Sequence, residues 1–483
     1  MQISSGDEAS KCGDAMHTKI YAGTLFDSEK CELIKHRVIS VSAKSGLILD
    51  VQPYSPGEVD ASVDFSDARN IDLRSKTVLP GFVDCHVHFF LHPYSETSWE
   101  DQNTRESLVE RTIRATVHAR ETLMAGYTAV RDLGTEGAGD ADVLFRKCVS
   151  GPNPLIPGPR YFCANRAIVT TGSYGCPRNR LYPNRAGVEG KTGAEAADGV
   201  DECIKVVRRQ VGAGADWIKL YADYRFRAEM TQVSPQTASE SLDTFNTDEL
   251  HAIVQTAHKL GVKVAAHTDG KSSWEGLISP DSSYQVDSVE HGHSVGESSF
   301  FRRSPDDYVA RDTGIRQPTV WIPTLSVYYT LGKDTPMWKQ AASTFTRAIK
   351  ASDLNVKIAC GGDTGTFAHG DNSLEMKLMV HLGADWKTVL RWGTLGGWEC
   401  IRSMRWEGQK GKERLAKIHE LREDARVVGD NEVPFGAVKQ GFAADIIATD
   451  GDLTQDFERA VDKGSIVFVM KGGRVYKRDG QTP

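Results

Sequence analysis

The sequence predicts an α/β fold: a (β/α)8 barrel of the TIM type, flanked by β structure at both chain ends. Residues 79–430 alternate apolar strand-like runs with helical patterns, as parallel βα units do. Residues 17–78 and 431–483 instead carry short strand-like runs separated by turn residues. The candidate barrel strands, whose number suits a closed barrel, are 79–88, 127–133, 160–166, 216–222, 262–268, 287–291, 320–325 and 357–363.

The two chain ends are expected to form a smaller β region. Residues 1–16 are polar and acidic, and we expect a disordered tail there. Strand-like runs follow at 18–22 and 37–41, and comparable runs return at 445–448 and 466–473.

Helical signals inside the barrel region are clearest after the fourth strand. Asn246 can cap a helix with Glu249 at its third position, an apolar stripe follows, and Gly261 ends it. Residues 401–433 are richer in charge and predict an exposed helical insertion before the C-terminal β region.

Composition narrows the classes of partner. The chain has 483 residues and a formal net charge of −7, which favours a small-molecule substrate over nucleic acid. No apolar run is long enough for a membrane span, and the start lacks the pattern of a secretory signal. Nine cysteines without regular spacing favour a reducing, cytoplasmic location. We also expect a homo-oligomer.

The first candidate strand ends in a pair of histidines. His86 and His88 point to the same side of an extended strand, which suits a metal ion that prefers nitrogen ligands. Cys85 between them should point to the opposite face and pack in the core. A single His-x-His pair is weak evidence, so the prediction depends on further ligands downstream.

Such ligands follow at four later strands. Lys219 lies in the fourth strand, His267 ends the fifth, His291 ends the sixth and Asp363 ends the eighth. The C-terminal ends of barrel strands meet at one face, where barrel active sites lie. A shared metal centre at that face is therefore predicted.

With these motifs the chain resembles the amidohydrolase superfamily of metal-dependent hydrolases, in particular its imidazolonepropionase-like and prolidase-like branch. The segments TGSYG (171–175), KLYADYR (219–225) and FAHGDN (367–372) are similar to one subgroup of that branch. The resemblance covers nearly the whole chain. It implies that both chain ends combine into one β-sandwich domain beside the barrel.

The resemblance also implies two divalent metal ions, with zinc expected. One ion would be held by His86, His88 and Asp363, the other by His267 and His291, with Lys219 bridging them. Burial beside cations favours the neutral amine of a lysine, which can add carbon dioxide and become a carbamate with two oxygens. The alternative is an unmodified lysine paired with one acid.

Catalytic roles are implied for Asp363, Lys219 and Tyr174. Asp363 would take the proton of a metal-bridging hydroxide as it attacks, and pass it to the leaving nitrogen. Tyr174 stands where many relatives carry a histidine in Gly-Gly-His-Gly, and its phenol could bind the carbonyl oxygen or oxyanion.

Substrate-facing residues are expected in the loops after the strands. Tyr224 and Arg225 follow the lysine strand, and an arginine there suits a substrate carboxylate. His369 and Asn372 follow the eighth strand and could close the pocket. Asp269 stands where many relatives have a second histidine. Ordinary hydrogen bonding within these loops is the alternative for the whole group.

The predicted activity is hydrolysis of an amide (C–N) bond in a small molecule, such as an N-acyl amino acid or a dipeptide. The alternative is a deaminase or cyclic-amide hydrolase acting on a heterocycle. Deaminases of the superfamily usually use one metal and lack the bridging lysine, so Lys219 argues against that reading. A metal-free barrel with a binding role is a third hypothesis, against which the complete ligand set argues.

Overall fold

The computed structural model describes most of the chain in eight stretches. These are residues 17–151, 153–174, 193–225, 241–270, 274–295, 318–351, 357–421 and 431–482. The predicted tail at 1–16 and Gly175 lie outside the described residues. Within the charged segment at 401–433, residues 422–430 also lie outside them.

The middle of the chain is built on parallel strands, and each predicted barrel strand contains one of them. They are β5 (Phe82–Val87), β6 (Tyr127–Asp132), β7 (Arg160–Cys163), β10 (Trp217–Tyr221), β13 (Lys263–Thr268), β14 (Ser288–His291), β15 (Val320–Ile322) and β16 (Lys357–Ile358). One sheet has the order β5-β6-β7. The other is seven-stranded, with the order β16-β15-β14-β13-β10-β8-β9, and includes the short strands β8 (Ala167–Val169) and β9 (Ala194–Ala196).

Hydrogen bonds join the two parallel sheets at both of their borders. Between β7 and β10, the Asp216 amide donates to the Cys163 carbonyl at 2.8 Å. Between β5 and the segment after β16, the Cys85 amide donates to the Cys360 carbonyl at 2.9 Å. The Asp363 amide donates to the His86 carbonyl at 2.8 Å. The C-terminal ends of β5 and β16 are therefore held beside each other.

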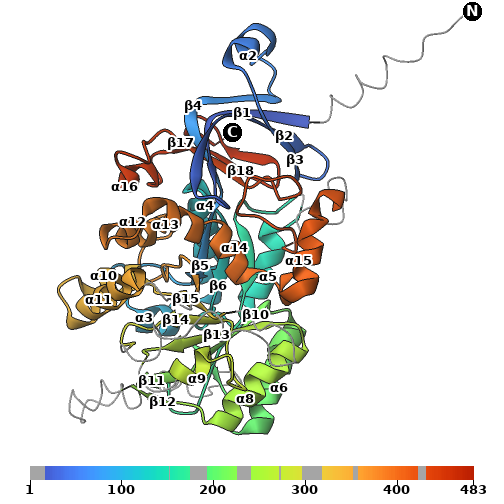
Figure 1. Ribbon diagram of the computed structural model, residues 1–483. Helices are drawn as coiled ribbons and strands as arrows, with labels where there is room; N and C mark the ends of the chain where they lie inside the picture. Colours follow the sequence, from blue (N-terminus) through green and yellow to red (C-terminus); the bar gives the residue numbers. More distant parts are fainter. Residues whose placement is uncertain are drawn as a thin grey trace, which may run out of the picture.

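Helices follow most of these strands in the described stretches and cover the outside of the sheets (Figure 1). The longer ones are α4 (Leu108–Met124), α5 (Ala141–Val149), α6 (Val200–Ala213), α8 (Thr247–Lys259), α10 (Leu325–Gly332), α11 (Pro336–Lys350) and α12 (Leu374–His381). The capping box predicted for α8 is present, because the side chains of Asn246 and Glu249 each accept a hydrogen bond from the other's backbone amide. The apolar stripe of α8 is buried at Leu250, Ile253, Val254 and Ala257, whereas Leu260 at its end is exposed. No helix in the described stretches has the length and apolar character needed to cross a membrane.

The charged segment begins as predicted with helix. After α14 (Leu395–Ile401) come the 3₁₀ turn η3 (Met404–Trp406) and α15 (Gly408–Ala416). The segment is not wholly exposed, because Trp406, Gly411 and Ile418 are buried. These residues attach α15 to the rest of the molecule.

Both ends of the chain enter a single mixed sheet, at the opposite end of the molecule from α6 and α8 (Figure 1). Its strands are β1 (His17–Asp27), β2 (Glu32–Ser42), β3 (Ile48–Pro53), β4 (Asn70–Pro80), β17 (Ile446–Thr449), β18 (Ile466–Lys471) and β19 (Arg474–Lys477). The order is β19-β18-β17-β4-β1-β2-β3. The central strand β4 pairs antiparallel with β17 and runs directly toward β5. This sheet thus ties the first and last parts of the chain to the start of the parallel core.

Candidate metal centre and active site

The predicted metal ligands converge at the C-terminal ends of the parallel strands. His88 Nε2 lies 3.2 Å from Asp363 Oδ1, and His86 Nε2 lies 3.6 Å from the same oxygen. The ring centroid of His291 is 5.1 Å from that of His86 and 4.5 Å from that of His267. His86, His291 and Asp363 offer ligand atoms that all lie within 4.8 Å of one another.

Lys219, in the middle of β10, completes this group. Its side chain is buried and interacts electrostatically with His267, His291 and Asp363. All six predicted ligands therefore lie in one neighbourhood.

Hydrogen bonds fix the orientation of three imidazoles. Nδ1 of His88 donates to the Gly134 carbonyl at 2.8 Å, and Nδ1 of His86 donates to Glu290 Oε2 at 2.9 Å. Nδ1 of His291 lies 2.7 Å from the Thr324 hydroxyl. In each ring Nε2 is left for a metal, which is how protein groups behind a ligand set its tautomer.

Glu290 belongs to a buried ionic network behind the ligands. Arg131, on β6, donates to Glu290 Oε1 at 2.8 Å, and the Ser288 hydroxyl donates to the same oxygen at 2.6 Å. Burial opposes ionisation of Glu290, but Arg131 and His86 outweigh it and lower its pKa to about 2. A stable carboxylate therefore faces His86 from the side opposite the site.

Burial and neighbouring charges also set the state of the ligands. Burial lowers the pKa of Lys219 to about 8, and it holds the pKa of His267 well below its usual range, with Lys219 adding to the effect. The pKa of Asp363 is lowered despite burial, because His86 and His88 lie beside it. At His88, Asp363 outweighs burial and raises the pKa to about 9. Once their protons are lost, Lys219 and the imidazoles offer lone pairs, and Asp363 offers a charged oxygen.

The site has polar atoms that no protein group satisfies in the described stretches. Lys219 Nζ and both ring nitrogens of His267 are buried and have no hydrogen-bond partner there. Leaving such groups unpaired costs about 1–3 kcal/mol each. Lone-pair donors without protein partners, next to a carboxylate, fit a metal centre of the nitrogen- and oxygen-ligand type.

The backbone is strained at several of these positions. His291 has φ 72°, Thr324 has φ 48° and Asp363 has φ 63°, all in the left-handed region that favours glycine. Such conformations persist where the surrounding structure enforces them, and they concentrate at functional sites. At His291 and Asp363, the strained residues are predicted metal ligands.

A second cluster adjoins the first. Ligand atoms of Asp223, His267 and Asp269 lie within 4.8 Å of one another. Asp223 is already bound by the Asp269 amide at 2.7 Å, by the Ser241 hydroxyl at 3.1 Å and by the Thr268 hydroxyl. Asp223 therefore anchors the loop after β13, and Asp269 is the carboxylate left beside His267.

Tyr174 lies at the site, with its hydroxyl bonded to Glu136 Oε2. Its ring stacks on Tyr221 at 4.5 Å, and Tyr221 stacks on His267 at 4.3 Å. For Tyr174 to bind a carbonyl oxygen, as the sequence predicts, its phenol would have to exchange the bond to Glu136.

Tyr224 and Arg225 lie on the short strand β11 (Asp223–Arg225), next to this aromatic stack. The Tyr224 ring meets Tyr174 edge-on at 5.1 Å. Arg225 is exposed, and its guanidinium donates to the Tyr224 hydroxyl at 3.3 Å. The structure thus places both beside the site, with Arg225 at its rim.

His369 and Asn372 lie deeper than expected. His369 is buried, stacks on His118 at 4.2 Å and donates from Nε2 to the Leu91 carbonyl at 2.9 Å. Asn372 donates to Asp84 Oδ2 at 2.8 Å. Both residues bind protein groups of β5 and the loop after it. These contacts correspond to the alternative of ordinary hydrogen bonding, rather than substrate contact, for these two residues.

Sequence analysis did not single out Glu136, Glu290, Arg131 or Thr324. Glu136 follows β6, has φ 49° and is buried, and burial raises its pKa. The one sequence signal was Glu290, an acid directly before His291 in the sixth predicted strand. Nothing local to Glu136 or Thr324 distinguished them from loop residues.

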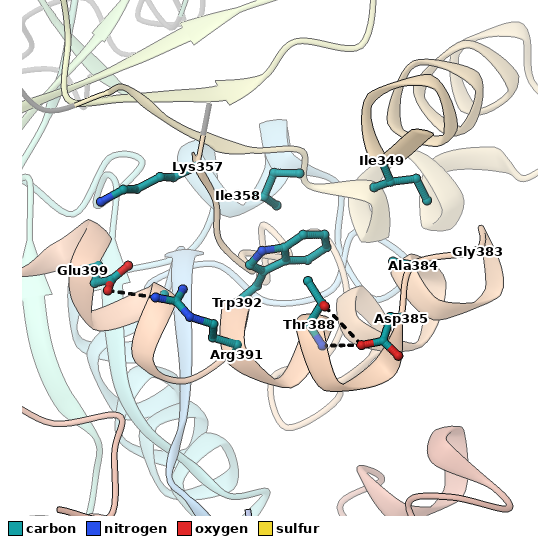
Figure 2. A pocket seen from close by; sticks show the side chains of 11 residues that line it. Ile349, Lys357, Ile358, Gly383, Ala384, Asp385, Thr388, Arg391, Trp392 and Glu399 are labelled. Atoms are coloured by element: carbon teal, nitrogen blue, oxygen red, sulfur yellow. Dashed lines mark hydrogen bonds and ion pairs between the residues drawn. The ribbon is translucent and has the colours of Figure 1, made fainter. Parts of the chain in front are cut away.

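A separate cavity of about 710 Å³ opens at the other end of β16 (Figure 2). It is lined by Lys357, Ile358 and residues of α13 (Trp386–Trp392) and α14. Two of its charged groups form a pair, since Arg391 donates to Glu399 at 3.0 Å. None of the predicted site residues lines it.

The comparison with known families decides the assignment. A sequence model of the amidohydrolase family matches residues 77–403, most of the chain. The chain belongs to the amidohydrolase family. It is therefore a hydrolase that acts on carbon–nitrogen bonds, and the converging residues described above lie within the matched region.

The relatives of this amidohydrolase align with nearly its whole length, but at low sequence identity. Ochratoxinase from Aspergillus niger is 24% identical over 503 aligned residues, covering 100% of this chain and 90% of the relative. A solved Xaa-Pro dipeptidase with methionine bound in its active site is 24% identical and has a TM-score of 0.69, covering 95% of this chain and 100% of that one. The solved A. niger ochratoxinase is 21% identical and has a TM-score of 0.67, covering 96% of each chain. At these identities the solved structures establish the shared fold.

Proposed function

We propose that the protein is a binuclear metal amidohydrolase that cleaves the amide bond of a small molecule of the N-acyl amino acid or dipeptide type. The observation that carries the proposal is the convergence of four histidines and Asp363 around Lys219, whose Nζ has no hydrogen-bond partner in the described stretches. The names of the relatives, an ochratoxinase and an Xaa-Pro dipeptidase, support an amide substrate.

Two divalent ions, zinc by expectation, suit these residues. His86, His88 and Asp363 would hold one, and His267 and His291 the other. The ions supply a lowered pKa for water and polarisation of the scissile carbonyl. Lys219 would add carbon dioxide at Nζ, with loss of one proton, and the resulting carbamate would present one oxygen to each ion.

Asp363 is the proposed proton carrier. Its carboxylate lies beside both His86 and His88 and stays ionised in this setting, so it can accept a proton from attacking water. Passing that proton to the departing nitrogen makes the amine a good leaving group. The left-handed backbone at Asp363, bonded to the His86 carbonyl, fixes where its oxygens point.

The rim of the site supplies the proposed contacts to substrate. Arg225 would pair with a substrate carboxylate, beside the Tyr224 hydroxyl that it already contacts. The stack of Tyr174 and Tyr221 on His267 would form an apolar wall along the scissile region. Tyr174 could also donate to the carbonyl oxygen after releasing Glu136.

Finer features of the architecture are proposals too. The hydrogen bonds at both sheet borders support a closed (β/α)8 barrel. Its eight strands would be β5, β6, β7, β10, β13, β14, β15 and β16. The mixed sheet of both chain ends would form a sandwich beside it. We also propose a cytoplasmic homo-oligomer that binds neither nucleic acid nor membrane.

Metal content and turnover test the proposal together. Purified protein should hold close to two divalent ions per chain by elemental analysis. It should hydrolyse members of an N-acyl amino acid and dipeptide library, lose activity on chelation and regain it with zinc, manganese or cobalt. Full turnover after exhaustive metal removal contradicts the proposal, whereas one ion per chain with release of ammonia from a heterocycle favours the deaminase alternative.

A further inference from the structure

Glu136 is a buried carboxylate at the site that the proposed chemistry does not use. It lies in the loop after β6, is 2% exposed and has the left-handed φ of 49°. A Cβ built on Gly134 would lie 3.4 Å from Glu136 Oε1 and 3.7 Å from Cε1 of His88. Glu136 and His88, a predicted metal ligand, therefore both lie next to Gly134, and their charges interact.

The two oxygens of Glu136 have different roles. Oε2 accepts a hydrogen bond from Trp99 Nε1 at 3.0 Å and another from the Tyr174 hydroxyl. In the described part of the chain, no group donates to Oε1 and no cation forms an ion pair with Glu136 within 4.0 Å. One side of the carboxylate is thus held rigidly, and the other is left for a donor that these residues do not supply.

An aromatic wall connects this carboxylate to the metal ligands. Trp99 packs on Tyr174 at 5.6 Å, and Tyr174 stacks on Tyr221 at 4.5 Å with ring planes 10° apart. Tyr221 in turn stacks on His267 at 4.3 Å. Aromatic faces beside a carboxylate attract an organic cation, because the ring quadrupole adds to the ionic interaction.

We propose that Glu136 binds the protonated amine of the substrate and selects amides that carry a free ammonium group next to the scissile bond, as dipeptides and other aminoacyl amides do. This inference rests on the proposed hydrolysis at the adjacent metal centre and names its substrate class. Together with Arg225 at the rim, it predicts a site for a molecule with a cation at one end and a carboxylate at the other. N-acylated analogues lack the cation and should be poor substrates.

The first test compares a dipeptide with its N-acetyl derivative, which has the same scissile amide. A charged hydrogen bond predicts that kcat/KM of the wild type favours the free amine by about 10- to 150-fold. Glu136→Gln keeps the shape of the side chain but removes its charge, and should bring this ratio close to one. Glu136→Asp keeps the charge on a shorter chain and should restore part of the preference. Glu110→Gln, in an exposed ion pair on α4, is the matched control and should keep the wild-type ratio.

The second test measures binding without turnover. Ketomethylene isosteres of the two substrates, one with a free amine and one acetylated, are titrated by calorimetry into the metal-loaded wild type and Glu136→Gln proteins, whose melting temperatures are compared first. The inference is supported if the wild type binds the free-amine isostere more tightly than the acetylated one and Glu136→Gln does not. This holds even if neither substrate is hydrolysed, because lack of hydrolysis would count only against the proposed function. Three outcomes overturn the inference: the wild type binds both isosteres equally, it binds neither, or Glu136→Gln weakens the binding of both equally.

Discussion

Two buried lysines on neighbouring strands show how differently the two ends of the parallel core are built. Lys219 lies in β10 and Lys263 begins β13, and both side chains are almost wholly buried. Lys263 Nζ donates to Glu407 Oε1 at 2.6 Å and to the Cys400 carbonyl at 3.0 Å. Lys219 Nζ has no hydrogen-bond partner among the described residues and lies 5.5 Å from the centroid of the Tyr221 ring.

The same contrast extends to the strands around them. At the N-terminal ends, Arg160 on β7 pairs with Asp445 at 2.6 Å, and Asp287, just before β14, pairs with His258 at 2.8 Å. At the C-terminal ends, neither ring nitrogen of His267 has a hydrogen-bond partner in the described stretches, although Nε2 lies 3.8 Å from Asp269 Oδ1. Charged groups that are paired within the chain contribute to the fold. Lone pairs that have no hydrogen-bond donor and gather at one end of the core remain available to a bound metal ion.

The largest expected effect is at Asp363. Asp363→Asn removes the proposed proton carrier and one negative ligand, so kcat should fall by at least the roughly 10²- to 10⁴-fold typical of lost general acid–base catalysis. Steady-state kinetics and metal analysis of the purified variant give both quantities. Asp371→Asn, which breaks only a surface pair with Lys463, should remain near wild type. A fully active Asp363→Asn enzyme would remove Asp363 from the chemistry.

The lysine pair tests the comparison directly. Lys219→Ala should lose most metal and activity, and it breaks no hydrogen bond of the described residues because Nζ has none there. Lys263→Met should keep its metal but be destabilised by roughly 1.5–3 kcal/mol, because it removes one of the two cations that bind the buried Glu407 and leaves only Arg402. Denaturant unfolding and elemental analysis of both variants provide the two readouts. If Lys263→Met lost its metal and Lys219→Ala kept it, the assignment of metal binding to Lys219 and of fold stability to Lys263 would be wrong.

The sequence predicted what depends on local periodicity and on strand order. His86 and His88 could be assigned to one face because side chains alternate along a strand, and the later ligands because parallel strands end at one edge. Partners from distant segments could not be foreseen: Arg131 and Glu290 are 159 residues apart. His369 shows a limit of sequence distance: its nearness to Asp363 in sequence left a pocket role and loop hydrogen bonding both open, and its ring packs against His118.

Acid should lower the free energy of unfolding through the ion pairs of Glu407 at the N-terminal end of the parallel core. Burial opposes ionisation of Glu407, but Lys263 and Arg402 outweigh it and lower its pKa from 4.5 to about 2. Its stabilising effect is complete above the unfolded pKa and is lost as the pH falls through the folded value, a change of about 3 kcal/mol at 1.36 kcal/mol per pKa unit. Denaturant unfolding of wild type and Glu407→Gln between pH 6 and 3 should show the stability gap shrinking with acid. A gap independent of pH would contradict the pairing.

Glu290 extends the comparison to the support of a ligand. Glu290→Gln keeps the shape but removes the carboxylate that fixes the His86 tautomer, and loss of such a partner typically weakens metal affinity by about 10- to 100-fold. Competition with a chelator measures this affinity. Glu399→Gln is the matched control, since its partner Arg391 lies in the cavity at the opposite end of β16. Equal metal affinity in all three proteins would show that Glu290 serves folding alone.

The smallest effect is expected at the rim of the site. Arg225 is exposed, and solvent screening limits the worth of such a pair to about 1 kcal/mol, or roughly fivefold in kcat/KM. Arg225→Ala should therefore raise KM modestly for substrates with a free carboxylate and leave kcat unchanged. The matched substrate with its carboxylate blocked as an amide should be unaffected, because it lacks the anion. Equal losses on both substrates would mean that Arg225 acts by holding Tyr224, whose hydroxyl lies 3.3 Å from its guanidinium. Tyr224→Phe would then reproduce the loss, whereas a true ionic contact would survive it.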